Sequence, residues 1–251
     1  MLRRFLSKNR KDSIIAVVKQ YFRVLVALAL VPVCYGVMRS LWGLALGFEQ
    51  VPEGSFYFLL GFVGYLAFQW VFFKPMRTYV FGHELTHAMA AWLTGGEVSH
   101  FHVGKKGGSV TVTKPNLFVA LAPYMVPLYA LILMALYFGV GLFYDLSKYW
   151  NYFLIILGAS MGFHLSLTVY ALKQDQPDLK SGGKLLSGIL IFLGNAVFLV
   201  FLLGVLFPRT VSWETFLRNT KTHTGVFCRR VGQGISYLWS RRMEIQNGPK
   251  R

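Results

Sequence analysis

Acidic residues are scarce in this sequence. Only 10 of its 251 residues are Asp or Glu, against 26 Lys or Arg, and charged residues of both signs make up 14%. Soluble domains usually contain about a quarter of charged residues. Because 55% of the residues are hydrophobic and the mean hydropathy is +0.48, this shortage argues against a soluble globular domain and indicates a membrane protein.

Cysteine is equally rare, and internal repeats are lacking. The two cysteines, Cys34 and Cys228, lie far apart in the chain. They form neither a disulfide framework nor the closely spaced pairs of a cysteine zinc site. No repeat or low-complexity tract is visible, so we expect one membrane domain rather than an array of modules.

Hydrophobic runs, by contrast, are frequent. A helix needs about 20 apolar residues to cross a bilayer. Five runs approach or exceed this length, at residues 22–47, 55–73, 116–144, 151–172 and 185–207, and a shorter sixth run covers 78–94. We therefore predict an all-α polytopic membrane protein with about six membrane helices. Its membrane-embedded domain, at 24–207, lies between a basic arm at 1–23 and a basic tail at 208–251.

Positive charge is concentrated at the two ends of the chain. The formal net charge is +16; the arm holds seven Lys or Arg against one Asp, and the tail holds nine against two Glu. These cations flank apolar runs and form no groove with interleaved aromatics, so no nucleic-acid partner is expected. The positive-inside rule predicts cytoplasmic termini. Because the arm lacks the apolar core of a signal peptide, the first run is expected to remain as an anchor.

A β-rich stretch follows the run at 78–94. Pieces at 98–103 and 109–113 flank the glycine-rich turn "GKKGG", a pattern that predicts a short β-hairpin. Unpaired strand edges cannot face lipid, so the hairpin is expected at the membrane surface or against other protein segments. His100 and His102 alternate along the first strand and are expected to be surface residues on one face.

The run at 78–94 contains the motif "HELTH". His83 and His87 are four residues apart, so on a helix they project from one face at the separation that two ligands of one zinc ion need. Glu84 then lies beside the metal, where a carboxylate acts as a general base toward water. It is the only acidic residue within a hydrophobic run. Because an unpaired ionisable group at membrane depth costs about 3 kcal/mol, the motif favours a metal site.

Three features of the sequence belong together: this motif, the following turn "LTGGEVSHF" and the element "LAPY" at 121–124. In these features the sequence resembles the site-2 protease family of intramembrane zinc metalloproteases. The resemblance covers roughly residues 78–200. It implies a zinc metalloendopeptidase of the bacterial inner (plasma) membrane. Its substrate would be a membrane protein, cleaved in or next to a transmembrane segment, and Zn²⁺ would be bound by His83 and His87 with Glu84 as the catalytic base.

The resemblance also implies an aspartate as the third zinc ligand, and two candidates lie in "QDQPDLKSGG". Asp178 follows proline as in the family's Pro-Asp-Gly setting, although Leu179 stands where the family has glycine. Asp175 is the alternative, because it would share a helix face with His164 if the fifth run continued as a helix. We expect Pro177 to end that helix and to let Asp178 turn toward the metal.

Other polar residues in the late runs have two interpretations. His164 and Asn195 are candidates for contacting the substrate or supporting the zinc ligands, but hydrogen bonding between helices would equally account for them. Gly158 and Gly162 are spaced for close helix packing on another face. The alternative to a protease is a membrane scaffold or chaperone with a structural or vestigial zinc site, and the oligomeric state stays open.

Two structural questions also stay open at this level. Six alternating spans place residues 173–184 outside and the start of the motif helix inside, so either this segment re-enters the membrane or the alternation is wrong. Three lysines of the hairpin region, Lys105, Lys106 and Lys114, favour its opposite placement.

The tail has apolar residues at helical spacing beside paired arginines: Phe227, Val231, Ile235 and Leu238. This pattern fits either a helix on an anionic membrane face or a frayed tail weakened by its glycines.

Overall fold

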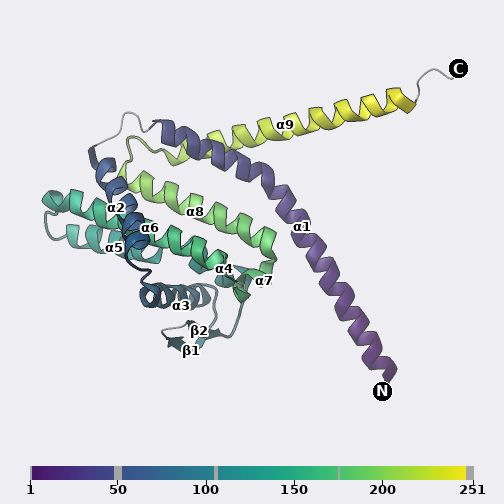
Figure 1. Cartoon of the computed structure of the whole chain (residues 1–251), viewed down its shortest axis with the longest axis horizontal. Coiled ribbons are helices and arrows are strands. Elements are labelled where there is room, and N and C mark those ends of the chain that lie inside the picture. The colour runs from purple at the N-terminus through teal and green to yellow at the C-terminus, as the bar shows by residue number, and fades with distance from the viewer. Residues whose placement is uncertain (1, 48–52, 105–106, 175, 247–251) are drawn as a thin grey trace. The chain divides into compact units, whose positions relative to one another are not determined.

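The computed structural model describes residues 2–47, 53–104, 107–174 and 176–246. These residues form helices joined by short loops, and the strands among them make one two-stranded sheet (Figure 1). By their internal contacts they divide into two compact units, one made of residues 1–48 and 200–251 and the other of residues 49–199.

The elements follow one another in a simple order. They are α1 (Leu2–Gly47), α2 (Glu53–Val71), α3 (Met76–Leu93), β1 (Val98–Val103), β2 (Gly108–Val112), α4 (Leu117–Met125), α5 (Leu128–Gly141), the 3₁₀ helix η2 (Ser147–Tyr149), α6 (Trp150–Leu172), α7 (Pro177–Gly182), α8 (Lys184–Leu206) and α9 (Trp213–Gln246). Because α1 is continuous, the predicted basic arm and the first hydrophobic run belong to one helix.

In the first unit, α1 and α9 pack against each other. Close approach requires glycine at Gly36, where a Cβ atom would lie 2.6 Å from the backbone oxygen of Thr220. The Thr220 hydroxyl donates to that of Ser40 over 3.1 Å. The rings of Tyr35 and Phe227 lie 5.0 Å apart. As residue numbers rise along α9 they fall along α1, so the two helices are antiparallel.

The centre of the second unit is a close contact between α2 and α6. Gly158 faces the backbone carbonyl of Phe58, and a Cβ atom at Gly162 would lie 2.9 Å from the backbone oxygen of Phe62. The predicted close-packing face of Gly158 and Gly162 is therefore confirmed. The small residues let the two backbones touch, which favours helix association without polar contacts.

These contacts make α2 and α6 parallel. The paired residue numbers rise together in both helices, and further along the Ser166 hydroxyl donates to the Gln69 side chain over 2.8 Å. In six strictly alternating spans, these two runs would point in opposite directions. If both helices cross a membrane, the chain between them must cross it an odd number of times, unlike the expected alternation.

The hydrophobic run at 116–144 forms a bent pair of helices rather than one. α4 and α5 meet at an angle of 68°. Pro127 lacks a backbone N–H and disfavours helical geometry at the residue before it, and Val126 is accordingly extended, with φ −91° and ψ 112°. The break leaves backbone groups near it without helical partners.

The predicted hairpin is present. β1 and β2 are antiparallel, with Val103 opposite Gly108 and Phe101 opposite Val110. Both strands contact α3. Gly108 permits this approach, because a Cβ atom there would lie 2.6 Å from the Glu84 side chain. The hairpin therefore covers the part of α3 that carries the motif.

The segment after α6 differs in detail from expectation. α6 ends at Leu172, and Pro177 begins α7 rather than ending α6. Proline suits the first turn of a helix, where its missing N–H would have no partner in any case. Asp178 follows it in the first turn of this short helix. Asp175 lies outside the described residues.

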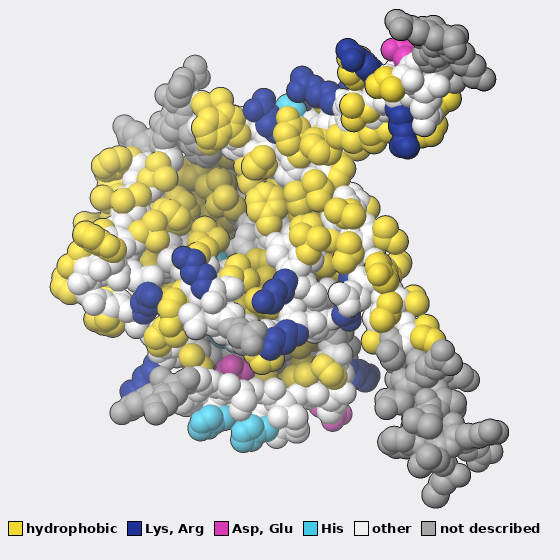
Figure 2. Space-filling view, turned by 45° about the vertical axis from the view of Figure 1, so that its right-hand side comes forward, with side chains coloured by type: hydrophobic (Ala, Val, Ile, Leu, Met, Phe, Trp, Pro, Cys, Tyr) yellow, Lys and Arg dark blue, Asp and Glu magenta, His cyan; other side chains and the backbone are white. Residues whose placement is uncertain are grey.

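Four helices in the described part of the chain are long and apolar enough to cross a membrane, or five if the bent pair α4–α5 counts as one span. Large hydrophobic side chains are exposed along and beside them, including Trp70 and Leu142 at 88% and 82%, and hydrophobic atoms dominate the face seen in Figure 2. This surface is compatible with a multi-pass membrane protein. The motif helix α3, expected as a sixth membrane helix, is not one of the candidates.

Candidate metal centre

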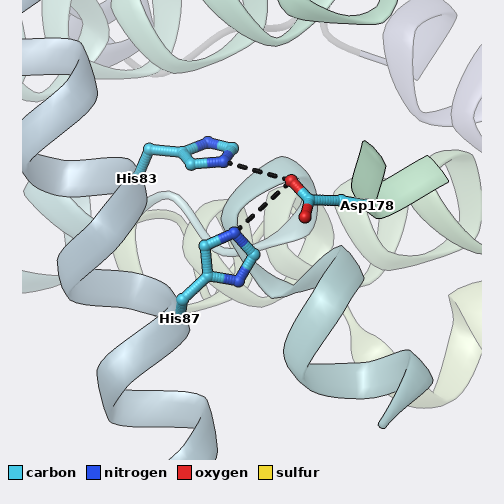
Figure 3. Close-up of side chains that lie close together, drawn as sticks. All are labelled: His83, His87 and Asp178. Carbon is cyan, nitrogen blue, oxygen red and sulfur yellow. Dashed lines mark ion pairs between the residues drawn. The ribbon is translucent and has the colours of Figure 1, made fainter. Parts of the chain in front are cut away.

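Two elements bring three potential metal ligands together. His83 and His87 project from α3 toward Asp178 of α7, and each Nε2 atom lies 3.5 Å from the same carboxylate oxygen (Figure 3). One ligand atom from each of the three residues lies within 4.8 Å of the others. Ligand atoms bonded at about 2.1 Å to one tetrahedral ion would lie about 3.4 Å apart, so the cluster is close to the size of such a site.

The helical spacing in α3 positions the two imidazoles. Their ring centroids lie 4.8 Å apart, as expected for residues one turn apart on one face. The rings of Tyr79 and Tyr124 lie 5.6 Å and 5.1 Å from the His83 ring and restrict its position. Among the described residues, the Nδ1 atom of His83 has no hydrogen-bond partner, so ring packing and the contact of Nε2 with Asp178 orient this side chain.

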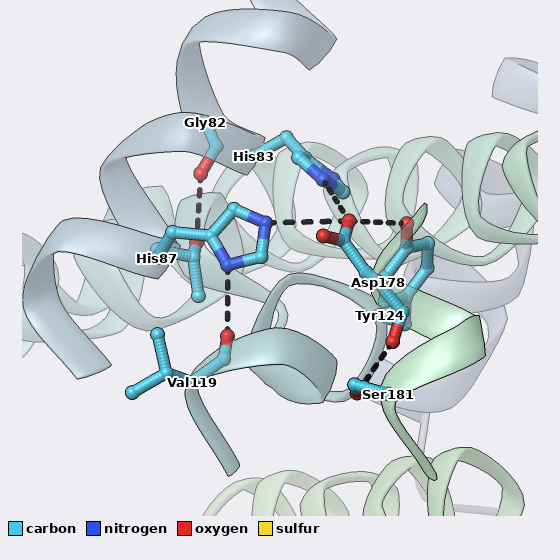
Figure 4. Close-up of polar contacts among 8 residues, drawn as sticks. Gly82, His83, His87, Val119, Tyr124, Asp178 and Ser181 are labelled. Carbon is cyan, nitrogen blue, oxygen red and sulfur yellow. Dashed lines mark hydrogen bonds and ion pairs between the residues drawn. The ribbon is translucent and has the colours of Figure 1, made fainter. Parts of the chain in front are cut away.

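His87, in contrast, is oriented by a hydrogen bond. Its Nδ1 atom lies 2.8 Å from the backbone carbonyl oxygen of Val119 in α4 (Figure 4). Because a carbonyl only accepts, Nδ1 carries the proton and Nε2 keeps the lone pair that a metal needs. In a regular helix that carbonyl would accept from residue 123, but Pro123 has no N–H. The proline of "LAPY" therefore leaves Val119 available to His87.

Asp178 is also held from two sides. The Tyr124 hydroxyl donates to its Oδ2 atom over 3.0 Å, and Ser181 donates to its backbone carbonyl over 2.7 Å. Burial raises the pKa of the Asp178 carboxyl, but the neighbouring imidazoles of His83 and His87 and the Tyr124 hydroxyl outweigh this and hold the pKa well below its usual range. The side chain therefore carries the negative charge that suits a metal ligand.

Glu84 lies beside this group and is not part of it. Its side chain is buried, with the residue 8% exposed, beneath Gly108 of the hairpin. The hydroxyl of the nearby Thr86 donates a hydrogen bond to the Gly82 carbonyl within α3 over 2.7 Å. Glu84 is thus a carboxylate that adjoins the ligand atoms without occupying a ligand position.

The cluster opens into a cleft of about 670 Å³. One wall is β2, another is the start of α4, and the end of α6 and the start of α7 close the far side. The residues that line it include Glu84, Ser109, Asn116, Tyr170 and Gln174. Strand β1 contributes no lining residue, so the side of β2 that faces away from β1 borders the cleft. The volume is typical of sites that bind a small ligand or a short peptide segment.

His164 and Asn195 do not line this cleft. His164 Nε2 lies 3.1 Å from Asn195 Oδ1, and Asn195 Nδ2 donates to the backbone carbonyls of Tyr124 and Ile191 over 2.7 and 2.9 Å. The Tyr124 carbonyl needs this donor, because Leu128, its regular helical partner, lies beyond the α4–α5 break. The pair therefore holds the backbone of a residue whose hydroxyl contacts Asp178. A role in contacting the substrate stays a prediction.

The hairpin histidines lie elsewhere. His100 and His102 are exposed on β1 with their rings stacked 6.4 Å apart, so the expected surface position is confirmed. Sequence reasoning missed the contributions of Val119 and Tyr124. Pro123 is a sequence signal for the contribution of Val119, because it leaves the carbonyl four residues earlier without its helical N–H donor. No sequence signal indicates that Tyr124 meets Asp178.

Comparisons of this chain with protein-family models, with curated proteins and with solved structures find no match.

Proposed function

We propose that this chain is an intramembrane zinc metalloprotease of the site-2 protease type. It would hydrolyse a peptide bond in or next to a transmembrane segment of a membrane protein. The observation that carries this proposal is the convergence of His83, His87 and Asp178 beside the buried carboxylate of Glu84. Two imidazoles and a carboxylate form a three-ligand set of the kind used by catalytic zinc sites, which leave a fourth position open.

The residues present fit the metal. His87 presents an unprotonated Nε2 because its Nδ1 donates to Val119, and the spacing of the ligand atoms is that of one small ion. A bound zinc ion supplies a Lewis acid that activates water and polarises a carbonyl. Glu84 accepts the proton of the attacking water and delivers it to the leaving amine. Burial of Glu84 keeps bulk water from competing for this proton.

The hairpin is suited to hold the substrate. The outer edge of β2 borders the cleft, and the described sheet has only two strands, so this edge offers unpaired backbone groups. An unwound stretch of the substrate would add to β2 as a third strand. Such pairing needs an extended backbone, which is also the conformation in which a peptide bond becomes accessible to Glu84.

We further propose five crossings in the bacterial inner membrane, formed by α1, α2, the α4–α5 pair, α6 and α8. The parallel contact of α2 with α6 supports an odd number of crossings between them. With the arm in the cytoplasm, the cleft is cytoplasmic as well. Of the nine Lys or Arg from residue 72 to 184, only Lys148 then lies outside, as the positive-inside rule favours. This arrangement moves the tail to the outer side, unlike the sequence-based expectation.

The alternative is a membrane scaffold with a structural zinc. Leu179 favours this alternative. It stands where the resemblance calls for glycine, and it packs in a hydrophobic cluster with Leu121 and Ile191. A structural site, however, has no use for the carboxylate of Glu84.

The substitution Glu84→Gln separates the two functions. It keeps the shape of the side chain and removes the base, so we expect unchanged zinc content in the purified protein and a loss of cleavage of about a hundredfold or more. Uncleaved substrate should accumulate in the membrane proteome of cells that carry the variant, with His83→Ala as the zinc-free control. If Glu84→Gln supports every phenotype of the wild type while His83→Ala abolishes them, the zinc is structural.

A further inference from the structure

The second half of α9 has a free surface. The helix continues from Trp213 to Gln246 through Gly232 and Gly234, although glycine lowers helix stability. Its first half packs on α1 through Thr220 and Phe227. From residue 228 to 246, every side chain is exposed. Roughly 28 Å of helix, at 1.5 Å per residue, therefore has no protein covering it within the described residues of its own compact unit.

This free half has an apolar face. At 100° per residue, six of its large apolar side chains fall within an arc of about 160°. They are Val231, Ile235, Leu238, Trp239, Met243 and Ile245, with exposed fractions from 41% to 78%; Tyr237 lies outside this arc. A continuous stripe of this kind in water costs free energy unless something apolar covers it.

The opposite face is basic. Arg229, Arg230 and Arg241 lie on it, together with polar residues, and Glu244 is the only acidic residue from 228 to 246. Arg242 and Gln246 fall among the apolar residues, and the long stem of Arg242 allows its guanidinium to reach outward. An apolar stripe that includes Trp, opposed by a face rich in arginine, is the pattern of helices that lie in a membrane interface.

A second copy of the helix is a poorer occupant. A coiled coil needs apolar residues alternately three and four positions apart. Val231, Ile235, Leu238 and Ile245 fit such a spacing, but Arg242 occupies the position between Leu238 and Ile245. In a parallel pair this arginine would bring like charges together in the seam.

We propose that residues 228–246 of α9 bind the surface of an anionic lipid bilayer. The apolar stripe lies at the boundary between headgroups and acyl chains, and the arginines contact lipid phosphates. Charge complementarity selects anionic over zwitterionic lipid, because each basic residue near such a surface strengthens binding by a factor of about five. The inference does not depend on the protease activity or on the side of the membrane where the tail lies.

Spin labelling of the full chain tests this binding. Cys34 and Cys228 are first replaced by serine. Single cysteines are then placed on the apolar stripe, as Ile235→Cys and Leu238→Cys, or on the polar face, as Gln233→Cys and Ser240→Cys. In vesicles of phosphatidylglycerol and phosphatidylcholine, labels on the stripe should be accessible to oxygen and shielded from a water-soluble nickel complex. Labels on the polar face should show the reverse. In phosphatidylcholine alone, the contrast should weaken.

Matched charge variants complete the test. Arg229→Gln/Arg230→Gln should lower the ratio of membrane-bound to free tails by about five for each arginine lost. Arg218→Gln/Lys221→Gln removes the same charge from the half that packs on α1 and should have a much smaller effect. If all four labels stay accessible to the nickel complex in anionic vesicles, the proposal is wrong. Dipolar broadening between stripe labels would instead assign the stripe to a second copy and would also overturn it.

Discussion

At the residue scale, the site depends on backbone groups that proline and a helix break release. Pro123 leaves the Val119 carbonyl to His87, and the break at Pro127 leaves the Tyr124 carbonyl to Asn195. Unpaired buried carbonyls are costly, so each attracts a side-chain donor. The same local irregularities that weaken α4 as a membrane helix thus orient the groups around the candidate metal site.

The Tyr124 hydroxyl should tune the metal affinity. Tyr124→Phe removes its hydrogen bond to Asp178, and loss of such a support to a ligand typically weakens metal binding by about 10 to 100-fold. The affinity can be measured by competition with a zinc chelator. Tyr137→Phe is the control, because it removes a comparable 2.9 Å hydrogen bond to Leu146 outside the residues that line the cleft. Equal zinc affinities in the two variants would show that Tyr124 does not support the ligand.

The identity of the third ligand is a second prediction at this scale. Asp178→Asn should lower zinc occupancy more than Asp175→Asn, because Asp178 lies 3.5 Å from both histidines. Elemental analysis of the purified variants measures this difference. The opposite ranking would transfer the ligand role to Asp175 and leave the proposed reaction unchanged.

At the scale of elements, the contact of α2 with α6 sets the directions of the helices. Gly158 and Gly162 let these helices approach until backbone meets backbone, and this approach fixes them as parallel. Side-chain packing of this kind is the main source of helix association within a bilayer, where the hydrophobic effect is absent. The ends of α2 and α6 therefore emerge together, which brings α3 and α7 to one site.

A methyl group at this contact should separate the helices. Gly158→Ala places a Cβ atom against the Phe58 carbonyl, and overpacking of this kind costs about 1–3 kcal/mol. Thermal unfolding in detergent should show a lower midpoint. Gly139→Ala is the matched control, since a Cβ atom there would meet nothing within 4 Å and alanine favours a helix. If both variants unfold at the same temperature, the glycine contact is not important for stability.

At the scale of the whole molecule, the number of crossings decides where the two ends lie. The antiparallel contact of α1 with α9 places the start of α9 next to the end of α1. If α1 crosses the membrane, its two ends lie on opposite sides. If these helices cross the membrane, this contact, in one compact unit, and the parallel α2–α6 contact, in the other, are each compatible with the proposed five crossings. That proposal predicts that the tail lies on the side opposite the arm.

Cysteine labelling of intact cells tests that topology. A cysteine at Ser240, on the polar face of α9, made in the background Cys34→Ser/Cys228→Ser, should react with a thiol reagent that does not cross the inner membrane. A cysteine at Lys180 in the same background should react only after the membrane is permeabilised, because α7 is on the cytoplasmic side in this arrangement. Protection of the cysteine at Ser240 in intact cells would restore cytoplasmic placement of the tail.

The sequence by itself determined the features that depend on local pattern. Hydrophobic composition predicted long apolar helices, alternating β-formers around a glycine-rich turn predicted the hairpin, and the spacing of His83 and His87 placed both on one helix face. Each of these rests on residues within one or two turns of each other. The close-packing face of α6 was likewise predictable, because two glycines four residues apart mark it.

Only the tertiary structure decided how these pieces meet. The 90 residues between His87 and Asp178 carry no pattern that predicts how far apart these two residues lie in space. Their meeting depends on the parallel packing of α2 and α6. The supporting contacts of Val119, Tyr124 and Asn195 join segments far apart in the chain. Hydropathy counts apolar runs but not their directions, so alternation of six spans does not predict the parallel contact of α2 with α6. Direction is set by which surfaces touch, which is a property of packing between helices.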